Sequence, residues 1–242
     1  MNTLKIDLMV ALDSIQFDQE YQCQCDLNIY KSPAGDSLVT QAEAGRQLHV
    51  LAKQTQALWV CTCDDDYPGW LPISEIGKLS LAAQPYQAAT VDAAAIQALV
   101  PTVIQFAQAA MATPNTYRWG GTVAPHYDCS GLMQAAFRAV GVQLPRDSYQ
   151  QETFVQPVEL AKLQAGDLIF FGTPERATHV ALYWEDGRYI HSSGKAQGRN
   201  GIGVDSIQDL SDPISRTYFQ QLRMCGRVVK SYQSTGQPMQ LR

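Results

Sequence analysis

The sequence predicts two domains of different class, a small β-barrel followed by an α+β domain. Short β-rich runs separated by turn residues fill residues 21–79. Two stretches whose apolar residues recur at helical spacing, 102–112 and 129–140, then precede a series of strand-like runs. Residues 82–95, rich in Ala and Gln, separate the two regions. We therefore divide the chain into a barrel, a linker, an α+β domain and a tail: 1–82, 83–100, 101–233 and 234–242.

Composition and charge exclude several classes of protein. Of the 242 residues, 45% are hydrophobic and 17% are charged, as expected of a globular protein with a sizeable core. The net charge of -5 argues against nucleic acid or an anionic membrane as a partner. Residues 1–10 hold Lys5, Asp7 and no long apolar run, so we expect neither a signal peptide nor a membrane span. These features predict a cytoplasmic protein.

The elements of the barrel follow from alternation and from turn residues. Residues 21–30 alternate in the manner of a strand and end at Ser-Pro-Ala-Gly over 32–35. Two further β-rich runs lie at 47–52 and 57–63. The acidic sequence Asp-Asp-Asp-Tyr-Pro-Gly at 64–69 predicts a turn.

The cysteines raise the question of a metal site. Four of them form two Cys-x-Cys pairs, and residues two apart in a strand share a face, so two such strands side by side would offer four thiols to zinc. The usual zinc spacing is Cys-x-x-Cys, however, and neither pair carries the glycine of a zinc knuckle. The sequence favours buried, reduced thiols, and we expect no metal and no cofactor. The six cysteines are Cys23, Cys25, Cys61, Cys63, Cys129 and Cys225.

Of the two predicted helices, the second carries a cysteine at its start. The first has Pro101 at its first position. The second runs over 129–140, with Asp128 as its expected N-cap. Cys129 then lies in the first turn, where unpaired N–H groups and the helix dipole favour a thiolate, and where the N–H of Cys129 can hold an oxyanion. The alternative is a small buried hydrophobe, the usual role of such a cysteine.

Strand-like runs follow the second helix, at 166–171, 179–184, 188–191 and 227–229. A three-residue loop over 185–187 pairs Ala181 with His191, and His179 lies two residues before Ala181, so both histidines share a face. A two-residue loop would place them on opposite faces. With the longer loop, Cys129 and His179 form a thiolate–imidazolium pair that His191 orients. Metal binding by this trio would lack a fourth ligand.

Several motifs over about residues 101–229 resemble those of the NlpC/p60 cysteine peptidases. The order and spacing of one Cys and two His carry the resemblance, together with Tyr-Arg-Trp-Gly-Gly at 117–121, Asp-Cys-Ser-Gly-Leu at 128–132, Arg-Asp-Ser at 146–148, Gly-Asp-Leu-Ile-Phe-Phe at 166–171, Thr-His-Val-Ala-Leu-Tyr at 178–183 and Tyr-Ile-His-Ser-Ser-Gly at 189–194. The first domain is similar to bacterial SH3-like domains in Leu-Asn-Ile-Tyr-Lys-Ser-Pro at 27–33, Gly-Arg-Gln-Leu-His-Val at 45–50, Trp-Val at 59–60 and Gly-Trp-Leu-Pro at 69–72.

The resemblance implies a papain-like α+β fold and the cleavage of cell-wall peptides. The SH3-like domain and the missing signal peptide resemble recycling-type members of the family. Those members cut between γ-D-glutamate and a diamino acid in murein peptides that have a free N-terminal L-alanine. On this resemblance Cys129 is the nucleophile, His179 the base and His191 the third polar residue.

The resemblance also implies residues that bind the substrate. In these relatives the residue before the cysteine and a tyrosine loop of the SH3-like domain bind the substrate amine. The corresponding residues here are Asp128 and Tyr67, with Asp65 or Asp66 nearby. Asp128 as a simple N-cap, and the acidic turn as a simple solvated loop, are the alternatives. Positions that line the pocket in the resemblance are Tyr117, Ser130 and Ser148, although Tyr117 also suits core packing.

Two other functions stay open at this point. One is a non-catalytic module that binds cell-wall peptides, and the other is an amidase or acyltransferase on the same fold, because a fold does not fix its function. The presence of all three catalytic residue types favours the peptidase.

Overall fold

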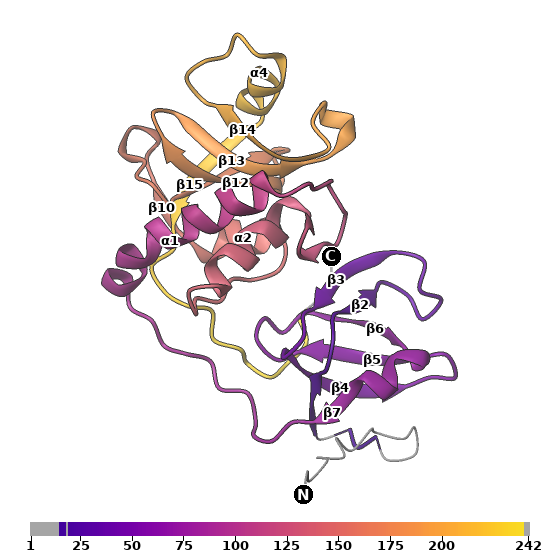
Figure 1. Cartoon of the computed structure of the whole chain (residues 1–242). Helices are drawn as coiled ribbons and strands as arrows, with labels where there is room; N and C mark the ends of the chain where they lie inside the picture. The colour runs from indigo at the N-terminus through magenta and orange to yellow at the C-terminus, as the bar shows by residue number, and fades with distance from the viewer. Residues whose placement is uncertain (1–14, 18, 240–242) are drawn as a thin grey trace, which may run out of the picture. The chain divides into compact units, whose positions relative to one another are not determined.

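The computed structural model describes residues 15–17 and 19–239, which form two compact units (Figure 1). One unit holds the described residues up to 87 together with 234–239, and the other holds residues 88–233. The β class of the first unit and the α+β class of the second are as predicted. The described part of the tail belongs to the first unit rather than standing apart.

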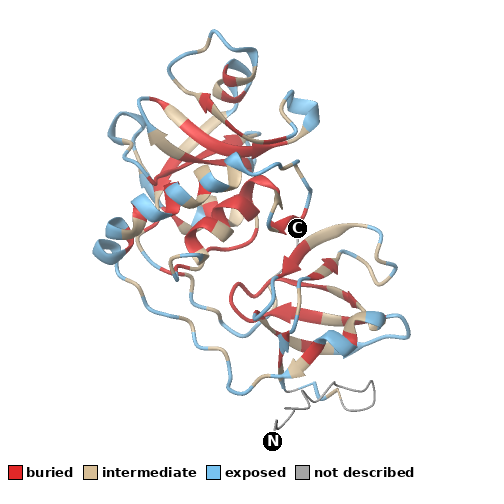
Figure 2. Ribbon diagram, in the orientation of Figure 1, coloured by how far each residue is buried: buried red, intermediate tan, exposed pale blue. Residues whose placement is uncertain are grey.

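The strands of the first unit are β1 (Glu20–Cys23), β2 (Leu27–Tyr30), β3 (Leu38–Ala42), β4 (Gln47–Lys53), β5 (Ala57–Thr62), β6 (Pro68–Pro72) and β7 (Leu79–Leu81), with the 3-10 helix η2 (Ile73–Lys78) before β7. They pair antiparallel in the order β3-β2-β6-β5-β4-β1-β7. Alternate side chains of β4 and β5, such as Leu48, Val50, Leu58 and Val60, face one apolar core. Figure 2 shows the buried residues along these strands.

The first unit differs from its prediction in three places. The alternation over 21–30 belongs to two strands, β1 and β2, rather than one. Strands β3, β6 and β7 were not predicted. The turn expected at 64–69 ends earlier, because the last two residues of that range begin β6. Asp66 within the turn takes a left-handed conformation, with φ of 56°.

The second unit contains α1 (Ala93–Ala112), β8 (Thr122–Val123), β9 (His126–Tyr127), α2 (Cys129–Arg138), α3 (Ser148–Phe154), β10 (Gln156–Val158), η3 (Leu160–Lys162), β11 (Leu168–Gly172), β12 (Ala177–Glu185), β13 (Arg188–Ser193), η4 (Lys195–Gln197), β14 (Gly201–Ser206), α4 (Pro213–Gln220) and β15 (Leu222–Arg227). Its main sheet is antiparallel, in the order β10-β15-β11-β12-β13-β14. Strand β15 ends where the last strand was predicted to begin, and β10, β14 and α4 were not predicted.

The two faces of this sheet pack against different helices. Val180 and Leu182 of β12 belong to an apolar core that they share with α1 and α2. Ala181 of β12 and Phe171 of β11 belong to a second core, which includes Tyr218 of α4. Neighbouring residues of β12 therefore serve opposite faces of the sheet.

Helix α1 begins at Ala93 rather than at residue 102, so the prediction for its start was wrong. Asp92 is the N-cap, and its side chain accepts a hydrogen bond from the first turn at 2.8 Å. Pro101 therefore lies inside the helix, and Val100 before it is already buried in the core. The helix takes up the last part of the segment 83–100 that the composition suggested as a linker.

Within the part of the chain that the structure describes, α1 alone is long and apolar enough to cross a membrane, judged by length and composition. Its mean hydropathy is 1.3, and 28% of the apolar stretch is buried. The buried side chains, Val103 and Ala107 among them, belong to the core that α1 shares with α2.

Candidate active site

Cys129 is the first residue of α2, as the sequence predicts. The side chain of Asp128 accepts a hydrogen bond from the backbone N–H of Gly131 at 2.7 Å, which makes Asp128 the N-cap. Cys129 is buried, with 6% of its surface exposed. The backbone N–H groups of Val180 and Ser130 are close enough to its sulfur to favour the thiolate and so to lower the pKa of Cys129, against the larger effect of burial. The sulfur therefore lies against the backbone of β12, one residue after His179.

A close approach between two backbone segments fixes the start of α2. A Cβ atom on Gly131 would lie 2.0 Å from the carbonyl oxygen of Gly121, so a side chain at this position has no room. The same carbonyl accepts a hydrogen bond from the backbone N–H of Asp128 at 3.0 Å. The paired glycines and the Cys-Ser-Gly sequence together hold the loop against the helix start.

Asp128 also forms a buried ion pair with Arg146. The Nη2 and Nη1 atoms of Arg146 donate to the two carboxylate oxygens at 2.5 and 3.1 Å, and Nη1 also donates to the hydroxyl of Ser130 at 3.0 Å. The backbone N–H of Gly120 bonds to the same carboxylate at 2.9 Å. The charge of Asp128 is thus already paired, and we expect a smaller contribution to binding a substrate amine than the resemblance implies.

Replacing Arg146 with methionine is expected to lower the free energy of unfolding by about 3–5 kcal/mol, because it leaves the carboxylate of Asp128 buried without its partner. Thermal or denaturant unfolding measures this loss. Lys162→Met is the matched control, since Lys162 forms an exposed pair with Glu159 at 3.0 Å and should leave the melting temperature nearly unchanged. Equal effects of the two substitutions would contradict the structural role of Arg146.

Strands β12 and β13 are joined by a two-residue turn rather than by the predicted three-residue loop. The turn residues 186–187 have positive φ angles of 49° and 75°. A β-bulge at Trp184 adds one residue to β12. The bulge restores the predicted register, in which Leu182 pairs with Ile190. The expected loop length was wrong, but the predicted parity of the two strands is preserved.

The two histidines share a face and begin a continuous series of hydrogen bonds. Nε2 of His179 lies 2.7 Å from Nδ1 of His191, and Nε2 of His191 lies 2.6 Å from Oδ2 of Asp205 on β14. Arg199 then donates from Nε to the carboxylate of Asp205 at 3.0 Å. His191 and Asp205 are buried, and Arg199 is only partly exposed.

The partners in this series fix where each imidazole proton lies. A carboxylate only accepts, so His191 donates from Nε2 to Asp205 and its Nδ1 is an acceptor. His179 therefore donates from Nε2 to His191. This arrangement leaves Nδ1 of His179 without a proton, which is the state that a general base needs.

Burial controls the protonation of the cysteine and of both histidines. It raises the pKa of Cys129 to about 12, with a further increase from the charge of Asp128. Burial, followed by the neighbouring His191, lowers the pKa of His179 well below 6.5. Burial also lowers the pKa of His191, against the opposing effect of Asp205. At rest these shifts favour a thiol and a neutral imidazole rather than the expected ion pair.

Two tyrosines lie close to the sulfur. The ring of Tyr218 stacks on the imidazole of His179 with 4.5 Å between centroids, and its hydroxyl lies 2.6 Å from that of Ser193. Burial raises the pKa of Tyr218 to about 12, and the charge of Cys129 contributes to the shift. Burial also raises the pKa of Tyr117, and the charge of Cys129 is again a contributor. Tyr117 is near enough to Cys129 for the charge of the cysteine to affect its pKa, and its role as a pocket residue stays a prediction.

The remaining predicted binding residues lie in different places. Ser148, at the start of α3, donates to the carbonyl of Ala177 at 3.4 Å, two residues before His179. Asp65 and Tyr67 belong to the first unit. There Asp65 lies 3.2 Å from Nη2 of the buried Arg46, so the acidic turn is not the solvated loop considered above. The role of these residues in binding a substrate stays a prediction.

Sequence reasoning missed Asp205, Arg199, Tyr218 and the pairing role of Arg146. The available signal for Asp205 is an acidic residue within a run that could form a strand, Gly-Ile-Gly-Val-Asp-Ser over 201–206. In the structure this run is β14, and its residues alternate between buried and half-buried. The two glycines weaken that pattern, and no strand was predicted there. Tyr218 carries no signal of its own in the sequence.

The chain matches two known families. Residues 114–227 match the family described as NlpC/P60, a range that includes Cys129, His179, His191 and Asp205. Residues 29–76 match the family described as bacterial dipeptidyl-peptidase Sh3 domain.

Several curated proteins are similar over part of the chain. A probable endopeptidase of Corynebacterium glutamicum (strain R) is 36% identical over 128 residues, which are 51% of this chain and 58% of that protein. A probable endopeptidase of Mycobacterium tuberculosis (strain H37Rv) is 40% identical over 110 residues, 46% of this chain and 28% of that protein. The murein DD-endopeptidase/LD-carboxypeptidase MepS of Escherichia coli K12 is 36% identical over 94 residues, 38% of this chain and 48% of that protein. The chain thus spans less than two thirds of the length of each of these relatives.

Among solved structures, an NlpC/P60 family protein from Bacillus cereus aligns over 88% of this chain and 64% of its own, with 21% identity and a TM-score of 0.48. The peptidoglycan hydrolase RipB of Mycobacterium tuberculosis aligns over 57% of this chain and 69% of its own, with 27% identity and a TM-score of 0.46.

Proposed function

The chain belongs to the NlpC/P60 family through residues 114–227, and on this premise we propose that it is a cysteine peptidase that cleaves peptidoglycan peptides. The names of its relatives as endopeptidases support peptidase activity. The single observation that carries the proposal is the hydrogen-bonded series His179–His191–Asp205. Its first residue, His179, precedes Val180, whose backbone N–H is close enough to the sulfur of Cys129 to lower the pKa of that thiol.

The proposed reaction uses the proton positions described above. As the sulfur of Cys129 attacks the scissile carbonyl carbon, the thiol proton moves to Nδ1 of His179. The positive charge that forms on His179 is stabilised through His191 by the carboxylate of Asp205. The backbone N–H of Cys129 holds the oxyanion. His179 then protonates the leaving amine, and water, activated by the same imidazole, hydrolyses the thioester and returns the proton to the sulfur.

The substrate that we propose is a murein stem peptide with a free N-terminal L-alanine, cut between γ-D-glutamate and the diamino acid. Tyr117 is near enough to Cys129 for the charge of the cysteine to affect its pKa, which fits a pocket residue. Asp128 precedes Cys129, but Arg146 already pairs its charge, so the proposed amine specificity rests mainly on the resemblance. Such short peptides arise during turnover of the cell wall, which would place the protein in the cytoplasm.

Two synthetic peptides test this function. The protein is expected to cleave L-Ala-γ-D-Glu-diaminopimelate, and to cleave the N-acetylated peptide at least about 100-fold more slowly. The reason is that acetylation removes the positive charge of the N-terminal amine, which the site is proposed to recognise. Mass spectrometry of the products reports both rates. Equal cleavage of the two peptides would contradict the amine specificity alone. Binding of the first peptide without any cleavage would instead favour a non-catalytic module, and transfer to an added amine would favour an acyltransferase.

A further inference from the structure

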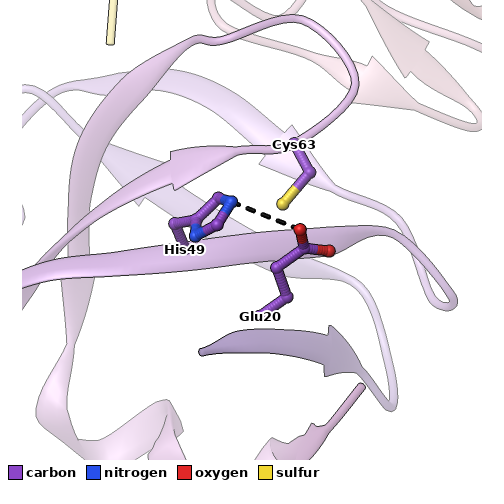
Figure 3. A group of neighbouring side chains, drawn as sticks. All are labelled: Glu20, His49 and Cys63. Atoms are coloured by element: carbon purple, nitrogen blue, oxygen red, sulfur yellow. Dashed lines mark ion pairs between the residues drawn. The ribbon is translucent and has the colours of Figure 1, made fainter. Parts of the chain in front are cut away.

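Three side chains of the first unit meet on one face of its sheet, away from the peptidase residues in sequence (Figure 3). Glu20 of β1 pairs with His49 of β4 in the strand register. Cys63 follows β5, and its backbone N–H bonds to the carbonyl of Gln47, two residues before His49, at 2.9 Å. Residues two apart in a strand share a face, so the three side chains point to the same side. We call them the Glu-His-Cys cluster.

The distances within the cluster fit a tetrahedral metal ion. Oε1 of Glu20 lies 3.4 Å from Nε2 of His49, and these atoms and Sγ of Cys63 all lie within 4.8 Å of one another. Zinc bonds of about 2.0–2.1 Å to oxygen and nitrogen set an edge of about 3.4 Å between the two ligands. A zinc–sulfur bond of about 2.3 Å sets edges of about 3.6 Å, so the sulfur would shift by roughly 1.2 Å at most.

The surroundings hold the ligands in place. The second carboxylate oxygen of Glu20 accepts a hydrogen bond from the backbone N–H of Tyr86 at 2.6 Å, the kind of contact that orients a metal ligand. Cys63 is buried but does not belong to the apolar core of the sheet, which includes Cys23 instead. Burial and the charge of Glu20 raise the pKa of the Cys63 thiol. A dication would reverse this effect, since it binds the thiolate.

We propose that Glu20, His49 and Cys63 bind one zinc ion in the SH3-like unit, with a water molecule in the fourth position. A thiolate and an imidazole select zinc over magnesium or calcium, which prefer oxygen ligands. The ion would join β1, β4 and the end of β5, so it should stabilise the sheet by mass action. The site uses a single cysteine of the two Cys-x-Cys pairs, unlike the four-thiol site considered from the sequence. The proposal is independent of the peptidase function.

Metal titration of the full chain tests the proposal. The Cys129→Ala variant is used throughout, so that the peptidase cysteine and its histidines do not supply a competing thiolate. Protein freed of metal by chelator is titrated with Zn²⁺ by calorimetry and with Co²⁺ by absorption spectroscopy. We expect one ion per chain, a thiolate-to-cobalt charge-transfer band, and a melting temperature that rises with zinc. His49→Ala and Cys63→Ser should each weaken zinc binding by more than about 100-fold, beyond the effect of an outer-shell partner.

Matched variants keep the test decisive. Cys25→Ser removes a thiol outside the cluster and should leave zinc affinity unchanged. Glu20→Gln keeps the shape of the ligand and serves if Cys63→Ser fails to fold, as judged by circular dichroism; it should weaken binding as well. Retention of full affinity in folded His49→Ala or Glu20→Gln would overturn the proposal. So would a cobalt complex without the charge-transfer band, or the absence of saturable binding.

Discussion

Replacing Cys129 with alanine is expected to reduce peptide cleavage by at least about 10⁴-fold, because the variant has no sulfur to form the thioester. The N-cap bond of Asp128 and the packing of Gly131 do not involve the thiol, so the helix start should stay intact. Product formation from L-Ala-γ-D-Glu-diaminopimelate, followed by mass spectrometry, measures the loss. Circular dichroism and the melting temperature show whether the fold is retained.

Cys225→Ala is the matched control for this change. Cys225 is a second buried thiol of the same unit, on β15, and it belongs to the core on the α4 face. Its removal should leave kcat within about threefold of the starting protein, since it does not touch the reacting groups. Appreciable turnover by the Cys129→Ala variant would show that another group performs the attack.

Replacing Asp205 with asparagine is expected to lower kcat by about 10²–10⁴-fold with little change in KM, the size of effect seen when a carboxylate that orients a catalytic histidine is neutralised. Asparagine offers an amide N–H as well as a carbonyl, so it no longer dictates that His191 donates from Nε2. In the other tautomer, His191 donates from Nδ1 to Nε2 of His179, so the proton of His179 lies on its Nδ1. That nitrogen must carry no proton if it is to accept one from Cys129.

The pH profile separates this positioning role from a structural one. Asp205 raises the pKa of His191, and its negative charge favours protonation of the histidine pair. Removing that charge lowers the pKa of the pair, so the acid limb of kcat/KM should move to lower pH while the maximum falls. A merely structural defect would lower the maximum and leave the limb in place.

Asp209→Asn is the control for the pH experiment. Asp209 is an exposed carboxylate shortly after β14, and its partners are the backbone N–H of Ser211 at 3.0 Å and the side chain of the same serine. Its neutralisation should change neither kcat nor the pH profile. If kcat falls no further in the Asp205→Asn variant than in this control, Asp205 does not position the catalytic histidines.

The start of α2 was predictable because its signals are local. The N-cap Asp128, the small residues that follow and the apolar periodicity all lie within one short stretch of chain. The same reasoning failed for α1. The sequence favours Pro101 as the first residue of the helix, whereas the capping residue Asp92 and buried residues before Pro101 extend it toward the N-terminus. Packing against the core outweighed the local cost of the proline.

The predicted shared face of the two histidines is correct, although the predicted length of the loop between their strands is wrong. A shared face for the two histidines requires an odd number of residues between the paired strands, and the predicted three-residue loop would hold all of them. The structure divides them between the turn 186–187 and the bulge at Trp184. Side-chain alternation depends only on the total, so the face shared by His179 and His191 was predictable although the turn was not.

Asp205 was beyond prediction for a different reason. Its contact with His191 depends on which strand lies beside β13, and the sequence does not state which strands are neighbours in a sheet. The zinc ligands proposed for the first unit share this property, since Glu20, His49 and Cys63 come from three separate parts of the chain. Residues brought together only by sheet topology leave no local pattern to find.

An affinity label is the most direct test of the central claim, that the sulfur at the start of α2 is the attacking atom. A chloromethyl ketone that carries the L-alanyl-γ-D-glutamyl group would be incubated with the protein, and the modified residue mapped by mass spectrometry among the six cysteines. We predict one label per chain on Cys129, with activity lost in proportion, and much slower labelling in the Asp205→Asn variant. Inactivation that proceeds while Cys129 stays unmodified would contradict the account.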